Sequence, residues 1–456
     1  MRCIGRVVTI ALAALTASSA GAQQARITVE QASDVLSALR GNLPAGLRGR
    51  AAAELKRLWP QWVEQHDRDV RARLARGDED SLVNFWLYGT SFTTQPPAVG
   101  RASPLPAAAL DDLARRRLED LLDRVISAGD NERLQFAGRV LAAHTADPRT
   151  PDGRERARRL LFDLRQRMVR EFVDAERTLA AARAGGGGVL AGTNATIFRD
   201  RGLSSDTSVL SDFSVHVALE QMARQGTLTP GSVRRAAVVG PGLDFTNKAD
   251  GHDDYPLQTL QPFSLVDALR RTGLAAADLR LTTFDINTRV NDHLRRAPGR
   301  AAGPAGYIVM LPPAGHETWT GQLRAYWHQW GSRIGDEVSA VSSPSGAGAL
   351  QARAVRIQPA VVLAITPRDL NVVVDRVAMP EGERFDLIIA TNVLVYYDVF
   401  EQALAASNVA AMLRPGGVFL TNTAVLPQPP LKASASYLRV DHSQERYDDI
   451  FWYQRQ

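Results

Sequence analysis

RFDLIIATNVLVYYD, residues 384–398, is the segment that decides the fold class of this chain. Its apolar and β-branched residues at 385–390 predict a short buried strand that ends at Thr391 and Asn392. The continuation ALAASNVAAMLRPGGVFL, residues 403–420, predicts a helix, a Pro-Gly-Gly turn and a further strand. Strand, helix and strand in this order form the βαβ unit of a parallel sheet.

The same alternation of strands and helices extends over most of the chain after residue 198. The expected strands are 236–239, 279–284, 306–311, 385–390 and 418–421, with 354–365 and 436–453 as candidate edge strands. The expected helices are 212–225, capped by Ser211 or Asp212, and 262–273, 318–330 and 398–413. This pattern predicts an α/β domain over 198–456 with a doubly wound, mostly parallel, Rossmann-like sheet.

The half of the chain before this domain has a helical pattern throughout. In the segment 152–184, apolar residues recur in steps of three and four, which favours one apolar face on a helix. Four consecutive glycines in AGGGGVLAG, residues 184–192, then interrupt the helical pattern. We therefore expect an all-α helical domain over 23–184, followed by a glycine-rich linker over 185–197.

Residues 1–22 have the composition of an export signal. Arg2 and Arg6 precede an apolar run, and Ala-Gly-Ala at 20–22 offers a small-residue cleavage site before Gln23. The run is shorter than the ~20 residues that a spanning helix requires, and no later stretch is long and apolar enough. We expect removal of this signal peptide, a periplasmic or secreted location, and no membrane span in the mature chain.

Charge and cysteine content argue against two further classes of protein. The formal net charge is +5 and falls to +3 without Arg2 and Arg6, which is a small excess for 456 residues. Because the sequence also lacks a basic stripe with interleaved aromatics, no nucleic-acid partner is expected. The only cysteine, Cys3, lies in the export signal, so the mature chain has no cysteine for a disulfide or a metal site, and we predict no metal.

Two strand ends carry the residues that suggest a ligand. The stretch AAVVGPGLDF, residues 236–245, ends a strand in the turn Gly-Pro-Gly, which either lets a ligand approach the backbone or only turns the chain. The strand in LRLTTFDIN, residues 279–287, ends in Asp285, which either accepts the hydroxyl protons of a ribose or serves as a helix N-cap. The distance between the two exceeds the usual ~20 residues, which an inserted loop at 246–261 explains.

Taken together, these segments resemble the class I S-adenosylmethionine-dependent methyltransferases. The likeness is strongest over 384–420, where NVLVYYD is closest to the chemotaxis-receptor methyltransferase type, as is the Asp-Leu-Asn triplet at 369–371. It covers roughly 195–456 and leaves the helical half unmatched. It departs from the family at Val238, where an acid near the methionine end of the cofactor is usual, and at Asp244, where a third glycine is usual.

The resemblance implies that S-adenosylmethionine is the cofactor and that it lies at the carboxyl ends of the strands. Gly240 and Gly242 would approach the methionine end, and Asp285 would bind the ribose. Glycine access, a ribose carboxylate and an apolar slot for the adenine also suit this cofactor on physical grounds.

The resemblance further implies the residues around the adenine and the sulfonium. Asp369 or Asn371, together with Leu370, would flank the adenine. Asn392 and Val393 would close the pocket near the sulfonium.

Candidates for a catalytic base lie in two loops. His316 and Glu317 precede the stretch 318–330, whose aromatic spacing is more typical of a core than of an active-site wall. The loop ADGHDDY, residues 249–255, offers His252 as a rival. Methyl transfer needs alignment of the acceptor and, for a hydroxyl acceptor, a base, so the sequence does not identify the acceptor.

Three hypotheses for function follow. The first is a methyltransferase-like protein that binds S-adenosylmethionine and acts on an unidentified small-molecule or protein acceptor. The second is an exported, non-catalytic binding or scaffold protein on a methyltransferase fold, because export separates the chain from a cofactor made in the cytosol. The third, a nicotinamide-dependent oxidoreductase, suits the Gly-x-Gly turn and the strand-end acid, but the segment at 384–420 disfavours it.

Overall fold

The fold is taken from a computed structural model that describes most of the chain. The described residues are 23–98, 106–184, 202–244, 253, 255–311, 318–340, 353–426, 429–433 and 437–456. The predicted export signal, 1–22, and the predicted linker, 185–197, lie outside these residues.

Helices and strands alternate in the second half of the chain and only helices follow one another in most of the first. The helices are α1 (Ser33–Ala38), α2 (Ala52–Tyr88), α3 (Ala107–Ile126), α4 (Glu132–Ala143), α5 (Pro151–Ala184), α7 (Val209–Arg224), α8 (Gln261–Arg271), α9 (Thr288–Ala302), α10 (Gly321–Gln329), α11 (Pro359–Leu363) and α12 (Val399–Met412). The strands are β1 (Gln23–Arg26), β2 (Val233–Val239), β3 (Ala275–Asp285), β4 (Tyr307–Leu311), β5 (Gly335–Val338), β6 (Arg353–Ile357), β7 (Ile365–Asp369), β8 (Asp375–Ala378), β9 (Phe385–Ala390), β10 (Leu413–Thr421), β11 (Leu431–Ala433), β12 (Leu438–Asp441) and β13 (Tyr447–Arg455).

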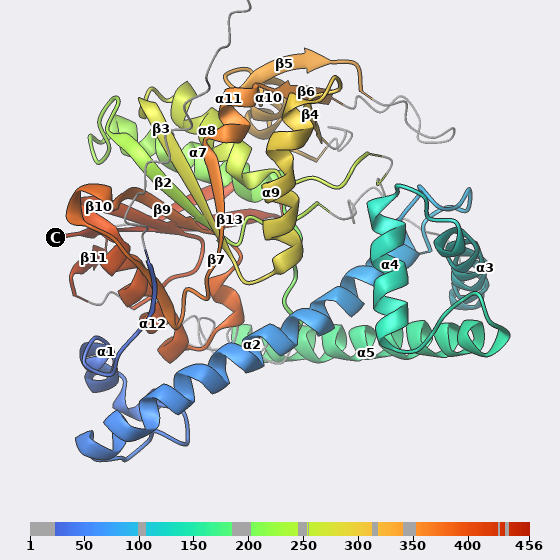
Figure 1. The fold of residues 1–456 in the computed structure, drawn as a ribbon, viewed down its shortest axis with the longest axis horizontal. Helices are drawn as coiled ribbons and strands as arrows, with labels where there is room; N and C mark the ends of the chain where they lie inside the picture. Colours follow the sequence, from blue (N-terminus) through green and yellow to red (C-terminus); the bar gives the residue numbers. More distant parts are fainter. Residues whose placement is uncertain are drawn as a thin grey trace, which may run out of the picture.

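The central sheet has the strand order β11-β13-β10-β9-β2-β3-β7, with β12 paired to β13 (Figure 1). Its five strands β7, β3, β2, β9 and β10 are parallel, and β13 runs antiparallel to β10. The chain passes from β2 through β3 to β7 on one side and then returns to β9 and β10 on the other. The expectation of an α/β protein with a mostly parallel, Rossmann-like sheet is confirmed, and β13 lies inside the sheet rather than at its edge.

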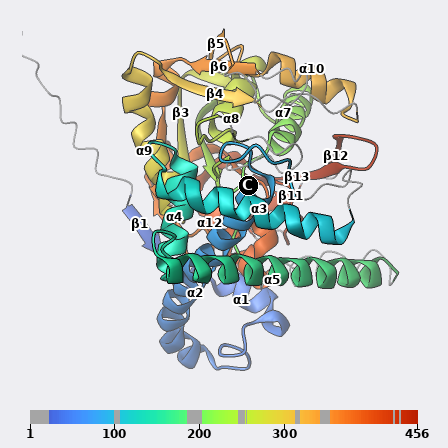
Figure 2. The ribbon, with the colours of Figure 1, turned by 90° about the vertical axis from the view of Figure 1, so that its right-hand side faces the viewer.

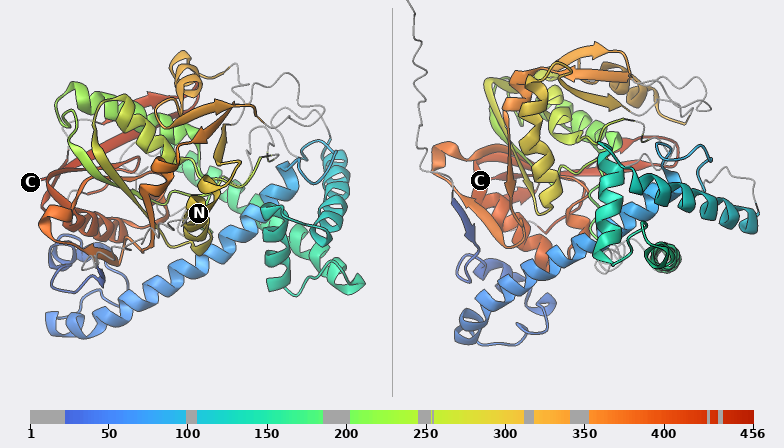
Figure 3. Two further views of the ribbon diagram at one scale, coloured as in Figure 1. Left: turned by 45° about the horizontal axis from the view of Figure 1, so that its top comes forward. Right: turned by 45° about the vertical axis from the view of Figure 1, so that its right-hand side comes forward.

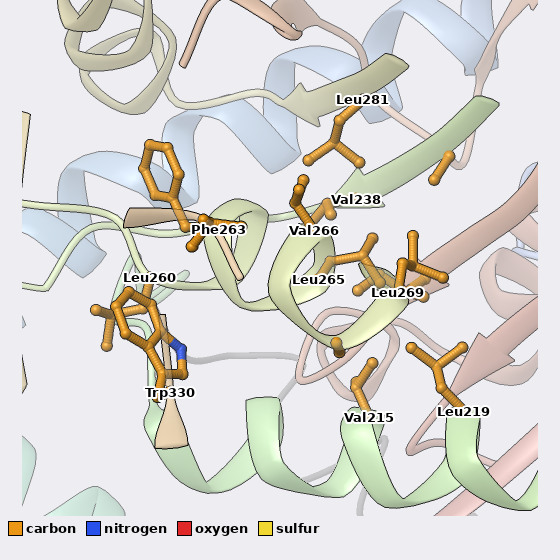
Figure 4. Packing of buried hydrophobic residues seen from close by; sticks show 14 of the residues in the cluster. Val215, Leu219, Val238, Leu260, Phe263, Leu265, Val266, Leu269, Leu281 and Trp330 are labelled. Carbon is orange, nitrogen blue, oxygen red and sulfur yellow. The ribbon is translucent and has the colours of Figure 1, made fainter. Parts of the chain in front are cut away.

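Alternate side chains of β2 divide the core between the two faces of this sheet. Ala236 and Val238 pack in a core with α7, α8 and α9, and Figure 4 shows α8 between α7 and the strands, with Leu265 close to Val238. Ala237 and Val239 pack in a second core with α1, α2 and α12. Because both faces are covered, the central strands consist of nearly unbroken apolar runs rather than alternating ones.

Helix α2 connects the sheet to a separate helical lobe. Its first half contributes Trp59, Val63 and Val70 to the core that covers the sheet, while residues near Trp86 belong to a core shared with α3, α4 and α5. Figure 1 shows α2 running from the side of α1 to this lobe, and Figure 2 shows α3 and α5 crossing the molecule there in similar directions. The division between cores therefore falls within α2, which differs from the expected domain boundary at residue 184.

The segment before α2 also belongs to the sheet domain. Strand β1 pairs antiparallel with β8, so residues 23–26 are a strand inside the region expected to be all-α. Trp59 of α2 donates a hydrogen bond to the carbonyl of Ile27, 2.8 Å away. A four-residue strand carries too little periodic signal to be recognised, and its partner lies some 350 residues later in the chain.

Strands β4, β6 and β5 form their own antiparallel sheet, on the side of the molecule away from α1 (Figures 1 and 3). The expected strand 306–311 is thus present as β4 but is not part of the parallel sheet. Strand and helix alternation predicts that a strand exists, whereas its partner depends on contacts that are distant in sequence. Helix α7 also begins earlier than expected, because Ser208, not Ser211 or Asp212, is its N-cap and accepts a hydrogen bond from Leu210 N–H.

Candidate functional site

A cavity lies at the carboxyl ends of the parallel strands, where the direction of strand addition reverses between β2 and β9. This topological switch point is where open α/β sheets bind their ligands. Six of the residues implied by the family resemblance line this one cavity, namely Gly240, Gly242, Asp285, Leu370, Asn392 and Val393. The strand ends near 240, 285 and 392 therefore converge, as the sequence predicted.

Two other residues implied by the resemblance are not among the residues that line the cavity. Asp369 forms an ion pair with Arg71 of α2, with 2.5 Å between Oδ1 and Nη2. Asn371 is fully buried, where its amide donates to Asp67 and its oxygen accepts from the amide of Val373. Both side chains connect helix α2 to the sheet, and Leu370, which lies between them in the chain, lines the cavity.

The glycine turn after β2 is shaped by the chain's own contacts. Gly240 and Gly242 both have φ of +68°, a conformation that glycine adopts without strain. A Cβ on Gly242 would lie 2.7 Å from the carbonyl oxygen of Asp206 and 2.8 Å from that of Ser205. Gly242 is therefore required for the close approach of the segment before α7, whereas the position of a Cβ on Gly240 is occupied by the side chain of Val393, with whose Cγ2 it would clash.

The amides of this turn are also used within the protein. Gly240 N–H donates to the carbonyl of Phe284 at 2.8 Å, and Gly242 N–H donates to the carboxylate of Asp285. The turn thus presents neither of these two amides to an anion.

Asp285 is a buried carboxylate at the end of β3. Its Oδ1 accepts a hydrogen bond from Asn287 N–H at 2.7 Å, and the residue is 9% exposed. Burial raises the pKa of Asp285 to about 7, against the opposing effect of the two backbone amides. The N-cap of α9 is Asn287 and not Asp285, so the carboxylate is directed to the cavity rather than to the helix.

Asn392, which follows β9, adopts a backbone conformation that is rare for residues other than glycine. Its φ is +59°, in the left-handed region where asparagine is among the tolerated residues. The side-chain amide of Asn392 donates to Ser211 Oγ at 2.7 Å. Asn422 accepts a hydrogen bond from the main-chain N–H of Asn392 and donates one to its side-chain oxygen. This network holds the end of β9 against the start of α7 at the cavity wall.

The sequence did not indicate the segment that covers the cavity. Residues 204–208, with the sequence Ser-Ser-Asp-Thr-Ser, all line the cavity. They lie over the glycine turn, where Leu243 N–H donates a hydrogen bond to the carbonyl of Ser205 at 2.5 Å. Leu74 of α2 and the pair Tyr396-Tyr397 complete the wall. A cluster of serines before a helix signals only a cap, because the contact with the turn joins segments that are far apart in sequence.

The candidate bases His316, Glu317 and His252 lie outside the described residues. The neighbouring Asp253 is described and is 1% exposed, and it accepts hydrogen bonds from the amides and hydroxyls of Thr90 and Ser91. Asp253 is therefore buried against the residues that follow α2 and is not part of a solvated turn.

Two negative findings apply to the described part of the chain. No group of three or more His, Cys, Asp or Glu side chains there is arranged to hold a metal ion. No helix there is long and apolar enough to cross a membrane.

The two departures from the family pattern are both buried. Val238 is fully buried between β3 and β9, so β2 contributes no carboxylate near the turn. Asp244 accepts a hydrogen bond from Gln258 at 3.0 Å and lies outside the cavity, and burial raises its pKa. Asp244 therefore connects the end of the glycine turn to Gln258.

The described lining of the cavity is acidic and partly apolar. Its described residues include two carboxylates, Asp206 and Asp285, and no Lys, Arg or His. Leu370, Val393 and Phe284 supply its apolar surface. Asp285 lines the cavity, and an ionised carboxylate only accepts hydrogen bonds. It is therefore suited to accept from ribose hydroxyls, which can donate.

Comparison with solved structures finds S-adenosylmethionine-dependent methyltransferases at low similarity. One is magnesium protoporphyrin IX methyltransferase from Synechocystis PCC 6803 with bound S-adenosylmethionine, at 10% identity over 54% of this chain and 80% of that one, with a TM-score of 0.26. TrmN from Thermus thermophilus matches at 10% identity over 54% of this chain and 52% of its own, with a TM-score of 0.25. The glycopeptide N-methyltransferase MtfA with sinefungin matches at 10% identity over 53% and 66%, with a TM-score of 0.22.

No protein-family model matches the sequence. No curated protein matches it significantly. These matches cover only about half of the chain, at low structural scores.

Proposed function

We propose that this chain is a methyltransferase-like protein that binds S-adenosylmethionine in the cavity at the switch point. The observation that carries the proposal is the convergence of three strand ends on one cavity whose described lining has two carboxylates and no cation. S-adenosylmethionine carries a sulfonium, an ammonium group and one carboxylate, so its net charge is positive, and a lining with carboxylates and no cation favours a ligand of that net charge.

Each part of the lining has a proposed task. Asp285 accepts the ribose hydroxyl protons, Leu370 offers apolar surface to the adenine, and Val393 with Asn392 closes the pocket near the sulfonium. Gly240 would lie beside the aliphatic part of the ligand, next to the side chain of Val393. When bound, the cofactor supplies an activated methyl group for an unidentified small-molecule or protein acceptor.

The same lining argues against the nicotinamide hypothesis. A dinucleotide carries a pyrophosphate, which needs free backbone amides or a cation. The amides of Gly240 and Gly242 donate within the protein, and the described lining residues contribute no cation. We therefore rank an oxidoreductase behind the methyltransferase proposal.

The test is a calorimetric titration of the chain from Gln23 with S-adenosylmethionine, S-adenosylhomocysteine and NAD. Saturable binding of the two adenosyl sulfur ligands, lost in Asp285→Ala and absent for NAD, supports the proposal. A ligand at 100 times its dissociation constant raises the free energy of unfolding by ~2.7 kcal/mol, so a thermal shift gives an independent measure. Absence of binding by wild-type protein contradicts it.

The alternative is an exported scaffold that keeps the fold without the chemistry. Two observations favour it: Val238 replaces a carboxylate, and the space next to Gly242 is filled by the chain's own backbone. A folded wild-type protein that binds none of the three ligands, S-adenosylmethionine, S-adenosylhomocysteine and NAD, would support this alternative. The helical lobe of α3, α4 and α5 would then be the proposed partner surface.

Two finer statements are proposals as well. The kinship with the chemotaxis-receptor methyltransferase type rests on the segment 384–420 alone. The periplasmic or secreted location rests on the composition of residues 1–22. Export separates the chain from cytosolic S-adenosylmethionine, so fractionation of the producing cell bears on both function hypotheses.

A further inference from the structure

We propose that a second cavity, beside the first, binds a small phenolic acceptor and that His442 Nδ1 accepts its hydroxyl proton during methyl transfer. This inference rests on the proposed function, since it takes the S-adenosylmethionine site as given. It goes further by assigning a class of acceptor and a catalytic base, whereas the bases suggested by the sequence lie outside the described residues.

The second cavity adjoins the cofactor cavity. Its volume is about 350 Å³, and Ser208, Ser211 and Asn392 line both cavities. Asn392 is the residue that the resemblance places near the sulfonium. The remaining lining residues come from the start of α7, from the segment that joins β12 to β13 and from the start of β13, namely Leu210, His442, Glu445, Arg446, Tyr447 and Asp448. An acceptor in this cavity would therefore lie next to the position proposed for the reactive methyl group.

The hydrogen bonds of Ser214 in α7 determine which nitrogen of His442 carries a proton. Ser214 Oγ lies 2.8 Å from His442 Nε2 and 2.9 Å from Asp448 Oδ2. It also lies 3.2 Å from the carbonyl oxygen of Leu210. A carboxylate and a carbonyl only accept, so the single hydroxyl proton of Ser214 goes to one of them and Ser214 accepts from His442 Nε2–H. The lone pair of the neutral imidazole is then on Nδ1, which has no hydrogen-bond partner among the described residues.

His442 is held in place and kept neutral. Its main-chain N–H donates to the carbonyl of Arg446 at 2.8 Å, and its carbonyl accepts from Thr320 N–H at 2.9 Å. The residue is 4% exposed, and this burial lowers the pKa of the imidazole. The carboxylates of Asp448 and Asp441 oppose that effect, whereas Arg446 adds to it. A fixed, neutral imidazole with an unshared lone pair meets the requirements of a general base.

The proposed step moves one methyl group and one proton. The acceptor oxygen bonds to the methyl carbon while the carbon–sulfur bond breaks, and the electron pair of that bond stays on sulfur, which gives S-adenosylhomocysteine. His442 Nδ1 takes the hydroxyl proton, and Asp448, 3.6 Å from Nε2, stabilises the imidazolium until the proton passes to water. A neutral imidazole removes the proton of a phenol more readily than that of an aliphatic alcohol, because the phenol is the stronger acid. Leu210 and the ring of Tyr447, on which Arg439 packs, add apolar surface to the lining.

The first measurement is nitrogen NMR of the histidine side chains in the wild-type chain from Gln23, saturated with S-adenosylhomocysteine and titrated with phenol. Near neutral pH, His442 should give the signals of an imidazole protonated on Nε2 alone, and its Nδ1 signal should shift as phenol binds. His293 is the control in the same spectrum, because it is 1% exposed, bonds to Tyr307 at 2.8 Å and does not line the cavity. The opposite tautomer, or an Nδ1 signal of His442 that phenol leaves unchanged, overturns the inference.

The second measurement uses His442→Phe, which keeps a ring and removes both nitrogens. It should weaken phenol about fivefold to tenfold, the usual net contribution of one hydrogen bond, and slow methyl transfer to phenol about a hundredfold or more. S-adenosylhomocysteine should bind to it as to wild type, because His442 does not line the cofactor cavity. His328→Phe, at an exposed position on α10, is the matched control and should change none of these.

The outcomes separate the inference from the proposed function. If His442→Phe binds phenol and methylates it as well as wild type does, the inference is overturned while the proposed function stands. If wild-type protein does not bind S-adenosylhomocysteine, the proposed function fails and the assignment of a methyl acceptor fails with it.

Discussion

Two buried aspartates differ in what surrounds them, although burial raises the pKa of each to about 7. Asp285 faces the cavity and accepts backbone amides, whereas Asp212 lies inside α7 with Ser264 as its hydrogen-bond partner at 2.6 Å. Oδ1 of Asp212 has no partner among the described residues. Asp285 is therefore suited to bind a ligand, and Asp212 is a cost to stability when it is ionised.

The first prediction concerns Asp212→Asn. A folded-state pKa above the ordinary value means that the folded protein binds this proton more tightly, so stability falls as the pH rises from about 4 to about 7. The amide cannot ionise and can still accept from Ser264. The gain in stability of the variant relative to wild type should be larger at pH 8 than at pH 5 by about 2–3 kcal/mol, at ~1.4 kcal/mol per pKa unit, because part of the effect is already present at pH 5. Urea unfolding at both pH values measures this, and equal differences at the two would refute it.

A second prediction follows for Asp285. If the ionised carboxylate accepts the ribose hydroxyls, S-adenosylhomocysteine should bind with constant affinity above about pH 7 and up to tenfold more weakly per pH unit below it. Calorimetry between pH 5.5 and 8.5 gives the profile. In Asp285→Asn the affinity should be low and independent of this titration. A wild-type profile without a change near pH 7 would remove Asp285 from the ribose site.

The third prediction separates crowding from backbone conformation at a glycine. Gly242 and Gly231 have nearly equal φ, +68° and +67°, but a Cβ would meet two carbonyl oxygens at Gly242 and nothing within 4 Å at Gly231. Alanine should cost about 1 kcal/mol at Gly231 from conformation alone, and clearly more at Gly242. Chemical unfolding of both variants tests the close approach of the segment 202–208. Equal costs would mean that this segment yields easily.

At the scale of elements, short segments from the N-terminal half complete the sheet domain. Strand β1 is attached to β8 by its ladder and by Arg26, which bonds to Asp375 at 2.9 Å and to Asp67 at 2.8 Å. The Asp375 side chain is 1% exposed, and burial raises its pKa even with this partner. Arg26 thus compensates two carboxylates that link β8 and α2.

The fourth prediction follows from this attachment. Arg26→Ala should lower the free energy of unfolding by about 1–3 kcal/mol, less than for a fully buried ion pair because the Arg26 side chain is 44% exposed. Lys56→Ala is the control, since its ion pair with Glu30 is exposed to solvent and should contribute little to stability. Guanidinium unfolding of the two variants measures the difference. A similar small effect for both would show that β1 is held by its backbone ladder.

Sequence patterns predicted the strands of this chain better than their pairing or the start of a helix. The strand 385–390 was predicted with the bounds that β9 has, because an apolar run buried on both faces is a strong local signal. The strand 306–311 was found too, but its pairing with β6 in a separate sheet was not. The start of α7 was misplaced, because Ser208, Ser211 and Asp212 are all acceptable caps and packing selects among them.

At the scale of the whole molecule, one long helix unites two cores. Helix α2 has one half in the core on the sheet and the other in the helical lobe, so the lobe is held at a defined place relative to the cavity (Figure 1). Leu74, between these halves, lines the cavity itself. Anything that binds the lobe acts on the same helix that contributes to the cavity wall.

The fifth prediction concerns the start of the mature chain. Strand β1 begins at Gln23, which pairs with Ala378, so cleavage after residue 22 leaves the strand intact and cleavage farther along would remove part of it. Intact-mass and N-terminal sequencing of protein from a periplasmic or secreted fraction should therefore find Gln23 first. Recovery of the chain from the cytosol with Met1 in place would contradict export and would restore access to cytosolic cofactor.

The sequence by itself determined the local order of strands and helices after residue 198, and the strand ends that carry Gly240, Asp285 and Asn392. These follow from periodicity and turn chemistry, which act between neighbours along the chain. Only the tertiary structure decided that Asp369 and Asn371 bind α2 instead of lining the cavity, that β1 joins the sheet domain, and that Asp206 covers the glycine turn. Those contacts join segments that are tens to hundreds of residues apart in the chain. They are therefore selected by burial and charge pairing as the whole chain folds, and not by local sequence patterns.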